Sequence, residues 1–135
     1  MIARKIYQPV HVVVKESPIH GRGVFALRNI GMGTLIEEAP ALFLPEEEKE
    51  LLQHSPLYNY YFLINNAAYP AVFGFGYSSF YNHSPKANCF YSFLLKKNII
   101  RFYALRKIAV DEEITINYNG SPNDDSPVYF PEYEQ

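Results

Sequence analysis

The sequence predicts a mostly β domain with a short helical insert. Its apolar residues gather in short runs bounded by turn residues, which is typical of strands rather than of long amphipathic helices. Pro122, Pro127 and Pro131 disfavour a helix near the end of the chain and predict an extended segment there. The strand-like runs are residues 10–14, 35–36, 41–44, 90–95, 99–105 and 114–118.

Two turns connect these runs. Gly31-Met32-Gly33 predicts a turn because glycine accepts positive φ at little cost. Lys96-Lys97-Asn98 lies between two apolar runs and predicts a hairpin.

The strongest helix signal begins at Pro45. Proline suits the first turn of a helix, and the glutamates at positions 46–48 would face the positive end of the helix dipole. Leu51 and Leu52 would then anchor this helix on the core. We expect a second helical piece over residues 57–64.

Length and composition predict one domain spanning residues 1–135. The chain is 48% hydrophobic, which is too apolar for a disordered protein. A net charge of -2 offers no general attraction to nucleic acid or to an anionic membrane. Because Cys89 is the single cysteine, the chain has neither a disulfide framework nor a cysteine-built zinc site. No signal peptide or membrane span is evident, so we expect a soluble intracellular protein, without a choice between cytoplasm and nucleus.

Aromatic residues cluster in one part of the chain. Ten of the 22 phenylalanines and tyrosines lie between Tyr58 and Tyr81. A general core would spread them more evenly, so the clustering predicts a local role.

The first motif is the glycine segment, His20-Gly21-Arg22-Gly23. Two glycines around one residue let the backbone pass close to a ligand, and Arg22 could grip a carboxylate with its guanidinium. An ordinary turn is the alternative interpretation.

The second motif is Asn82-His83-Ser84 inside residues 79–89. Polar side chains within an aromatic segment need partners, and a bound ligand is one such partner. The alternative is a structural turn with a buried histidine. A metal site is not expected, because His83 and Cys89 lack further ligands.

The third motif runs from Asp111 to Tyr118. Its three acids predict a solvated turn, after which Ile114, Ile116 and Tyr118 share one strand face. A buried Tyr118 hydroxyl would need a hydrogen-bond partner, which a core carbonyl could also provide.

Taken together, the three motifs resemble the SET-domain protein lysine methyltransferases. That family carries a Gly-x-Gly segment, then an "RFxNHSCxPN"-like segment, then a "GEELTxxY"-like segment, in the order found here. Residues 60–66 also resemble the family's "YLFxLxN" stretch, so the likeness spans about residues 18–118. It implies a SET-type β-clip of small curved sheets with a short helical insert and a threaded C-terminal segment.

The resemblance also implies an activity, a cofactor and site residues. The activity is transfer of a methyl group from S-adenosyl-L-methionine to a lysine of a protein substrate, which in many family members is a histone. Tyr118 corresponds to the central active-site hydroxyl. The cofactor would be held by His20, Gly21, Arg22, Gly23, Asn82 and His83. The lysine channel would be lined by Tyr60, with Tyr77 and Phe80 as further wall residues.

The chain departs from the family pattern at several positions. Ser79 replaces the arginine of "RFxNHS", and Pro85 replaces the following cysteine. Residues 120–135 stand where many relatives carry a zinc-binding, cysteine-rich segment. We expect Tyr129, Phe130 or Tyr133 to fold back over the cofactor or substrate site, with a loose tail as the alternative. Without flanking zinc modules, a homodimer that completes the peptide groove is a further alternative.

Two other functions compete with the enzyme. The SET fold could serve as a catalytically inactive module that binds a peptide or ligand. A nucleic-acid binder could use the basic residues Lys96, Lys97, Arg101, Arg106 and Lys107 with the interleaved Phe102 and Tyr103. The acidic overall charge disfavours this second alternative, and we expect neither nucleic acid nor membrane as a direct partner.

Overall fold

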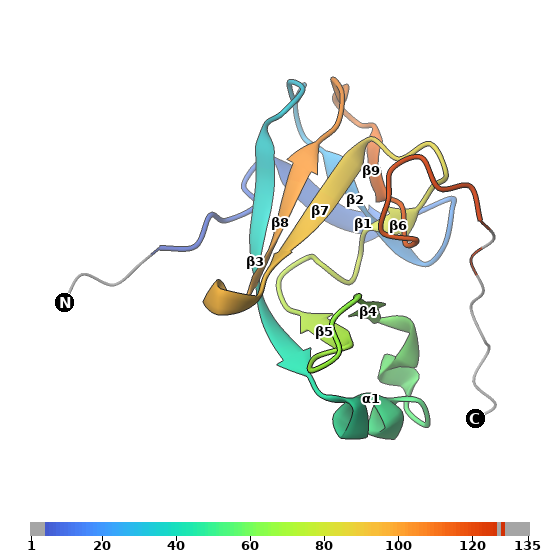
Figure 1. Ribbon diagram of the computed structural model, residues 1–135. Coiled ribbons are helices and arrows are strands. Elements are labelled where there is room, and N and C mark those ends of the chain that lie inside the picture. Colours follow the sequence, from blue (N-terminus) through green and yellow to red (C-terminus); the bar gives the residue numbers. More distant parts are fainter. Residues whose placement is uncertain (1–4, 127, 129–135) are drawn as a thin grey trace.

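The computed structural model describes residues 5–126 and residue 128. Two curled sheets form the fold, and one short helix accompanies them (Figure 1). The first sheet has the strand order β1-β2-β9-β6 and the second the order β4-β5-β3-β8-β7. The strands are β1 (Val12–Glu16), β2 (Arg22–Ala26), β3 (Leu35–Leu44), β4 (Tyr61–Leu63), β5 (Ala71–Gly74), β6 (Asn82–His83), β7 (Cys89–Leu94), β8 (Ile99–Ala104) and β9 (Glu113–Ile116). The helices are α1 (Glu46–Leu52) and the 3₁₀ turns η1 (Pro56–Asn59) and η2 (Leu95–Lys97).

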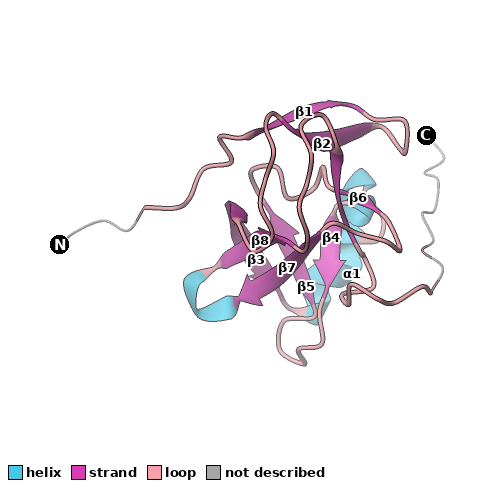
Figure 2. Ribbon diagram, turned by 90° about the horizontal axis from the view of Figure 1, so that it is seen from above, coloured by secondary structure: helices cyan, strands magenta, loops and turns pink. Residues whose placement is uncertain are grey.

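The two sheets occupy different parts of the molecule. In Figure 1 the strands β3, β8 and β7 lie side by side, and α1, β4 and β5 lie at one end of them. Figure 2 shows β1 and β2 apart from these three strands, on another side of the molecule. The prediction of a mostly β fold with a small helical insert is confirmed.

One long strand, β3, replaces two predicted short ones. Pro40 separates residues 35–36 from residues 41–44 in the sequence, yet the strand passes through it. Pro40 lies where the partner changes, since Pro40 pairs with Ile99 of β8 and Ala41 pairs with Gly74 of β5. A proline is tolerated at such a switch because its missing N–H is not needed there, while its carbonyl accepts the N–H of Phe75 at 2.8 Å.

The predicted turns are confirmed. β7 and β8 form a hairpin through η2, which Asn98 closes with a left-handed φ of 53°. Asparagine is among the few non-glycine residues that adopt this conformation readily. Gly33 has a φ of +82° in the other turn, beside an isolated bridge between Ile30 and Ile108.

The helix predictions were partly wrong. α1 follows Pro45 and carries three glutamates in its first turn, as expected. However, none of its seven residues is buried, and Leu51 is 74% exposed, so Leu51 does not anchor it. Of residues 57–64, only the first three are helical, in the 3₁₀ turn η1 that ends at Asn59, and Tyr61–Leu63 instead pairs with β5. The aromatic content of this stretch suits a pleated strand.

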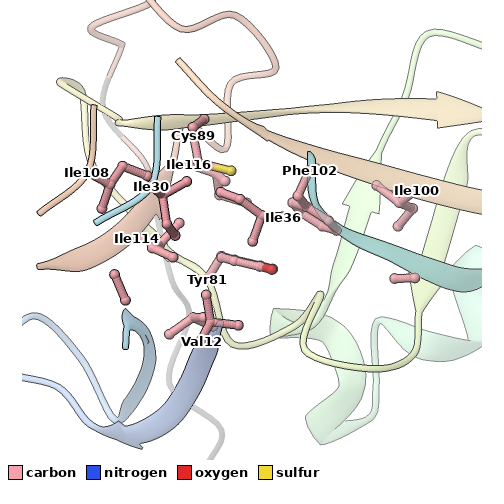
Figure 3. Packing of buried hydrophobic residues seen from close by; sticks show 14 of the residues in the cluster. Val12, Ile30, Ile36, Tyr81, Cys89, Ile100, Phe102, Ile108, Ile114 and Ile116 are labelled. Carbon is pink, nitrogen blue, oxygen red and sulfur yellow. The ribbon is translucent and has the colours of Figure 1, made fainter. Parts of the chain in front are cut away.

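One core joins the two sheets. Ile114 and Ile116 of β9 and Ile100 and Phe102 of β8 are all fully buried in it. Tyr81, from the loop before β6, stacks on Phe102 with ring centroids 4.4 Å apart, and Figure 3 shows it within the same cluster. Because residues from both sheets share this core, the position of β9 is fixed relative to β8.

None of the helices that the structure describes is long and apolar enough to span a membrane.

Candidate active site

The two-residue strand β6 brings the second motif beside the third. Asn82 pairs with Thr115 and His83 with Ile116, in parallel. The N–H of Ser84 extends this ladder by donating to the Ile116 carbonyl at 2.9 Å. This pairing places the Asn82-His83 turn near Tyr118, which follows β9 by two residues.

The side-chain amide of Asn82 fastens the glycine segment to this strand. Its nitrogen lies 3.0 Å from the carbonyl oxygen of His20 and 3.1 Å from that of Arg22. It also lies 2.8 Å from Oε2 of Glu113. Asn82 is buried, so these bonds fix the backbone path of the first motif against the other two.

Glu113 completes this junction, although the sequence predicted only a solvated acid there. Its carboxylate accepts the Ser17 hydroxyl at 2.7 and 2.9 Å, in addition to the Asn82 amide. A Cβ at Gly23 would collide with this carboxylate, so the close approach requires glycine. Ser17 and Glu113 were missed because nothing in the linear sequence links residues 96 positions apart.

Tyr118 is held at both its backbone and its hydroxyl. Its N–H donates to Nδ1 of His83 at 3.1 Å, and the two rings lie 5.3 Å apart. Its hydroxyl donates to the backbone carbonyl of Tyr81 at 2.6 Å. Burial is the main cause that raises the pKa of Tyr118 well above its usual value, with smaller contributions from Tyr91 and Glu113. Tyr118 is therefore a neutral phenol near pH 7.

Two cavities meet at Tyr118. The larger, which we call the glycine-side cavity, has a volume of about 480 Å³ and runs along the glycine segment. The smaller, which we call the tyrosine-side cavity, has a volume of about 180 Å³ and an aromatic wall. They share four lining residues, which are Asn59, Tyr60, Ser79 and Tyr118.

The predicted site residues are distributed over these cavities as follows. The residues His20, Gly21, Arg22, Asn82 and Phe80 line the glycine-side cavity. Tyr60 and Tyr118 line both cavities. Gly23 is the buried end of the glycine segment, His83 contacts the Tyr118 backbone, and Tyr77 lies against the core.

The clustered aromatic residues have a local role in the tyrosine-side cavity. Its wall contains Tyr58, Tyr61, Phe62 and Tyr81 besides the shared residues, and the rings of Tyr58 and Tyr61 meet edge to face at 5.8 Å. Val128, from the tail, also lines it. The expected lid residues Tyr129, Phe130 and Tyr133 lie outside the described residues.

The nucleic-acid interpretation finds little support in the described residues. Phe102 is fully buried, so it cannot stack on a nucleic-acid base, and Arg101 and Arg106 are paired with Glu38 and Glu112. Within residues 5–126 and residue 128, no three His, Cys, Asp or Glu side chains form a group that could hold a metal ion.

Comparison with known proteins identifies the family. A model of the SET domain matches residues 21–119. A Schizosaccharomyces pombe protein, histone-lysine N-methyltransferase, H3 lysine-37 specific, is 33% identical to this chain over 106 residues. The aligned part covers 78% of this chain and 71% of the relative.

Solved structures share the fold. A candidate histone methyltransferase of Plasmodium falciparum has a TM-score of 0.63 and 29% identity, and the alignment covers 89% of this chain and 97% of that one. A humanized mutant of the Chaetomium thermophilum Polycomb Repressive Complex 2, bound to the inhibitor GSK126, has a TM-score of 0.67 and 24% identity. It covers 83% of this chain but only 15% of the other, and this second likeness shows the fold alone.

The family match contains Gly21, Arg22 and Gly23 of the glycine segment, the Asn82-His83 turn and Tyr118, which the structure brings together around two adjoining cavities. The chain belongs to the SET domain family of protein lysine methyltransferases.

Proposed function

We propose that this protein transfers a methyl group from S-adenosylmethionine to a lysine side chain of a protein substrate. The observation that carries the proposal is the junction of the two cavities, which share Asn59, Tyr60, Ser79 and Tyr118. A methyl donor on one side and an alkylamine on the other would meet at this junction.

The glycine-side cavity fits the cofactor. Asn82 holds the carbonyls of His20 and Arg22, so the segment presents a fixed backbone to a ligand. Gly21, at a φ of +49°, leaves open space where a side chain would otherwise stand. Arg22 is exposed along this cavity and would bind the cofactor's carboxylate through its planar guanidinium. When bound, S-adenosylmethionine supplies a methyl group activated by a positively charged sulfur.

The tyrosine-side cavity fits the lysine. Its aromatic wall attracts an ammonium group through the ring faces and packs against the apolar stem of the side chain. Free lysine has a pKa of about 10.4 and is protonated near neutral pH. Removal from water and the positive sulfur of the bound donor would both lower the pKa of the amine, which favours the neutral, nucleophilic form against the attraction of the rings for the cation.

Tyr118 orients the amine in this scheme. Because its hydroxyl proton is donated to the Tyr81 carbonyl, the Tyr118 oxygen acts as an acceptor toward an incoming amine N–H. The raised pKa of Tyr118 excludes a role as a strong phenolate base near pH 7. The protein thus contributes position and exclusion of water, which suffice when little covalent chemistry is required.

We further propose a basic protein segment, and a histone tail in particular, as the substrate. The S. pombe relative is named for lysine 37 of histone H3, which supports this choice. Glu46, Glu47 and Glu48 are exposed in α1, which contacts η1, and Asn59 at the end of η1 lines both cavities. These acids would attract lysine- and arginine-rich chains toward the junction.

The test is methyl transfer by pure protein. The wild-type chain should label core histones from radioactive S-adenosylmethionine, and mass spectrometry should place the methyl groups on lysine. Tyr118→Phe should bind the cofactor normally in calorimetry but lose most turnover, by roughly a hundredfold or more, as with loss of a transition-state hydrogen bond.

Tyr103→Phe is the matched control. Tyr103 lies on β8, stacked on Phe90 at 5.1 Å, and lines neither cavity. Its loss should leave turnover unchanged. Full activity in Tyr118→Phe would remove this residue from the central role. Cofactor binding without transfer to any protein would instead indicate a SET-fold binding module.

A further inference from the structure

A buried glutamate lies behind the aromatic wall of the tyrosine-side cavity. Glu37 of β3 is 1% exposed. Burial raises its pKa, and hydrogen bonds from the Tyr77 N–H and the Tyr81 hydroxyl oppose that rise. Burying a carboxyl group is costly, and a methionine or leucine would fill this position in a core at lower cost. The presence of an acid here therefore calls for a role beyond packing.

The two carboxylate oxygens bind both ends of one short segment. Oε2 accepts the backbone N–H of Tyr77 at 2.9 Å, and Oε1 accepts the hydroxyl of Tyr81 at 2.8 Å. Gly76 precedes the segment with a φ of +63°, and a Cβ there would collide with the same carboxylate. Residues 76–81 are therefore folded closely around the Glu37 side chain.

This segment forms part of both cavities. Ser78, Ser79 and Tyr81 line the tyrosine-side cavity, and Ser79 and Phe80 line the glycine-side cavity. The Ser79 hydroxyl also donates to the Tyr60 carbonyl at 3.1 Å. At its end, the carbonyl of Tyr81 accepts the hydroxyl of Tyr118.

The hydroxyl of Tyr81 is the unusual part of this arrangement. The Tyr81 ring stacks on Phe102 in the core, and a phenylalanine would keep that contact (Figure 3). The hydroxyl is buried with the ring, which is 1% exposed, and it donates to Glu37. Two polar groups, the Glu37 carboxylate and the Tyr81 hydroxyl, are thus buried together. The same residue, Tyr81, accepts the Tyr118 hydroxyl at its backbone carbonyl.

We propose that Glu37 is a positioning residue of the active site. Its carboxylate holds residues 77–81 so that the Tyr81 carbonyl fixes the hydroxyl of Tyr118. The inference rests on the proposed function, since Tyr118 is the group being positioned. Small displacements of such a group reduce catalysis strongly while leaving ligand binding largely intact.

The experiment compares Glu37→Met with Glu37→Gln. Methionine fills the space but accepts neither hydrogen bond, whereas glutamine can accept from the Tyr77 N–H and donate to the Tyr81 oxygen. We expect Glu37→Met to lower kcat by about ten- to a hundredfold, with unchanged cofactor affinity and an unchanged KM for the histone. Glu37→Gln should restore most of that loss.

Glu38→Met is the matched control. Glu38 is also a buried glutamate of β3, at 8% exposure, but it binds Arg101 and the Tyr7 N–H, away from both cavities. Its replacement should lower thermal stability and leave kcat unchanged. A fall in kcat of the same size in Glu38→Met would mean that general destabilisation explains the effect, and would overturn the proposal.

A second readout does not depend on methyl transfer. In protein labelled with ¹³C at the tyrosine rings, the Tyr118 resonance, assigned by its absence in Tyr118→Phe, should shift in Glu37→Met and not in Glu38→Met. If wild-type protein transfers no methyl group, the proposed function fails and this signal alone decides the positioning role. A folded Glu37→Met with an unmoved Tyr118 signal would overturn the inference. Should Glu37→Met not fold, Tyr81→Phe removes one of the two bonds, keeps the ring contact and carries the same two readouts.

Discussion

His83 accepts the backbone N–H of Tyr118 at Nδ1, so the ring must leave that nitrogen unprotonated. The neutral ring therefore carries its proton on Nε2, and protonation of Nδ1 would place two donors against each other. Burial lowers the pKa of His83 below its usual 6.5. The environment of His83 thus favours the form that the Tyr118 backbone needs.

A dependence of stability on pH follows from this shift. The unfolded chain binds a proton on His83 at a higher pH than the folded chain does, so the free energy of unfolding rises with pH between the two pKa values. The stabilising contribution is fully present above about pH 6.5 and is lost as the pH falls through the lowered pKa of the folded state. Urea unfolding of the wild type at pH 7.5 and at lower pH should show this loss.

His83→Gln provides the comparison for this measurement. The glutamine side chain does not titrate, so the variant should show a shallower fall in stability over the same pH range, although other groups add their own slopes. Identical slopes for the wild type and His83→Gln would contradict the assignment.

At the level of elements, the sequence predicted those whose signals are local. The hairpin at Asn98, the start of α1 after Pro45 and the strands with apolar runs all depend on neighbouring residues, and all are confirmed. The helical piece predicted over residues 57–64 was wrong beyond Asn59, because Tyr61–Leu63 pairs with β5, a partner that local preference does not reveal.

The strands that were missed are fixed by distant partners. β6 has only two residues and exists through its parallel pairing with β9. β2 was interpreted as part of a glycine segment, since Arg22 and Gly23 carry no strand signal of their own. The same holds for the site: motifs predicted Asn82 and Tyr118, whereas Glu113 and Glu37 act through contacts that only the fold creates.

The tail after Tyr118 is tied to the two asparagines that flank Tyr118. The side-chain amides of Asn117 and Asn119 donate to the carbonyls of Asp124 and Ser126. Val128 then lines the tyrosine-side cavity. We propose that residues 120–135 close the site.

Truncation tests this proposal for the tail. A chain ending at Gly120 should lose measurable binding of a histone peptide in calorimetry, because it lacks the anchored turn and Val128, which lines the tyrosine-side cavity. A second chain that ends at Val128 separates the anchored part from residues 129–135. Unchanged affinity in the chain ending at Gly120 would reject the closing role.

On the scale of the whole molecule, the glycine-side cavity depends on long-range contacts. Asn82 contacts residues about sixty positions earlier, and Tyr118 contacts Tyr81, 37 positions earlier. Because both sheets share one core, local opening of either sheet should disturb the cavity. Cofactor binding should therefore be linked to global rather than local unfolding.

Ligand binding should then stabilise the entire chain. At a cofactor concentration of about 100 times Kd, mass action predicts a gain of roughly 2.7 kcal/mol in the free energy of unfolding. Hydrogen exchange should slow in both sheets, including β7 and β8, which lie outside the glycine-side cavity. Slower exchange confined to β2 and β6 would show that the site opens independently of the core.

The parallel pairing of β6 with β9 determines when the site can form during synthesis of the chain on the ribosome. β6 can be completed only by a strand that begins at Glu113, about thirty residues further along the chain. During synthesis, the glycine segment and the Asn82-His83 turn therefore leave the ribosome well before the strand that completes the glycine-side cavity. The cavity should therefore form in one late step, when β9 has been synthesised and pairs with β6.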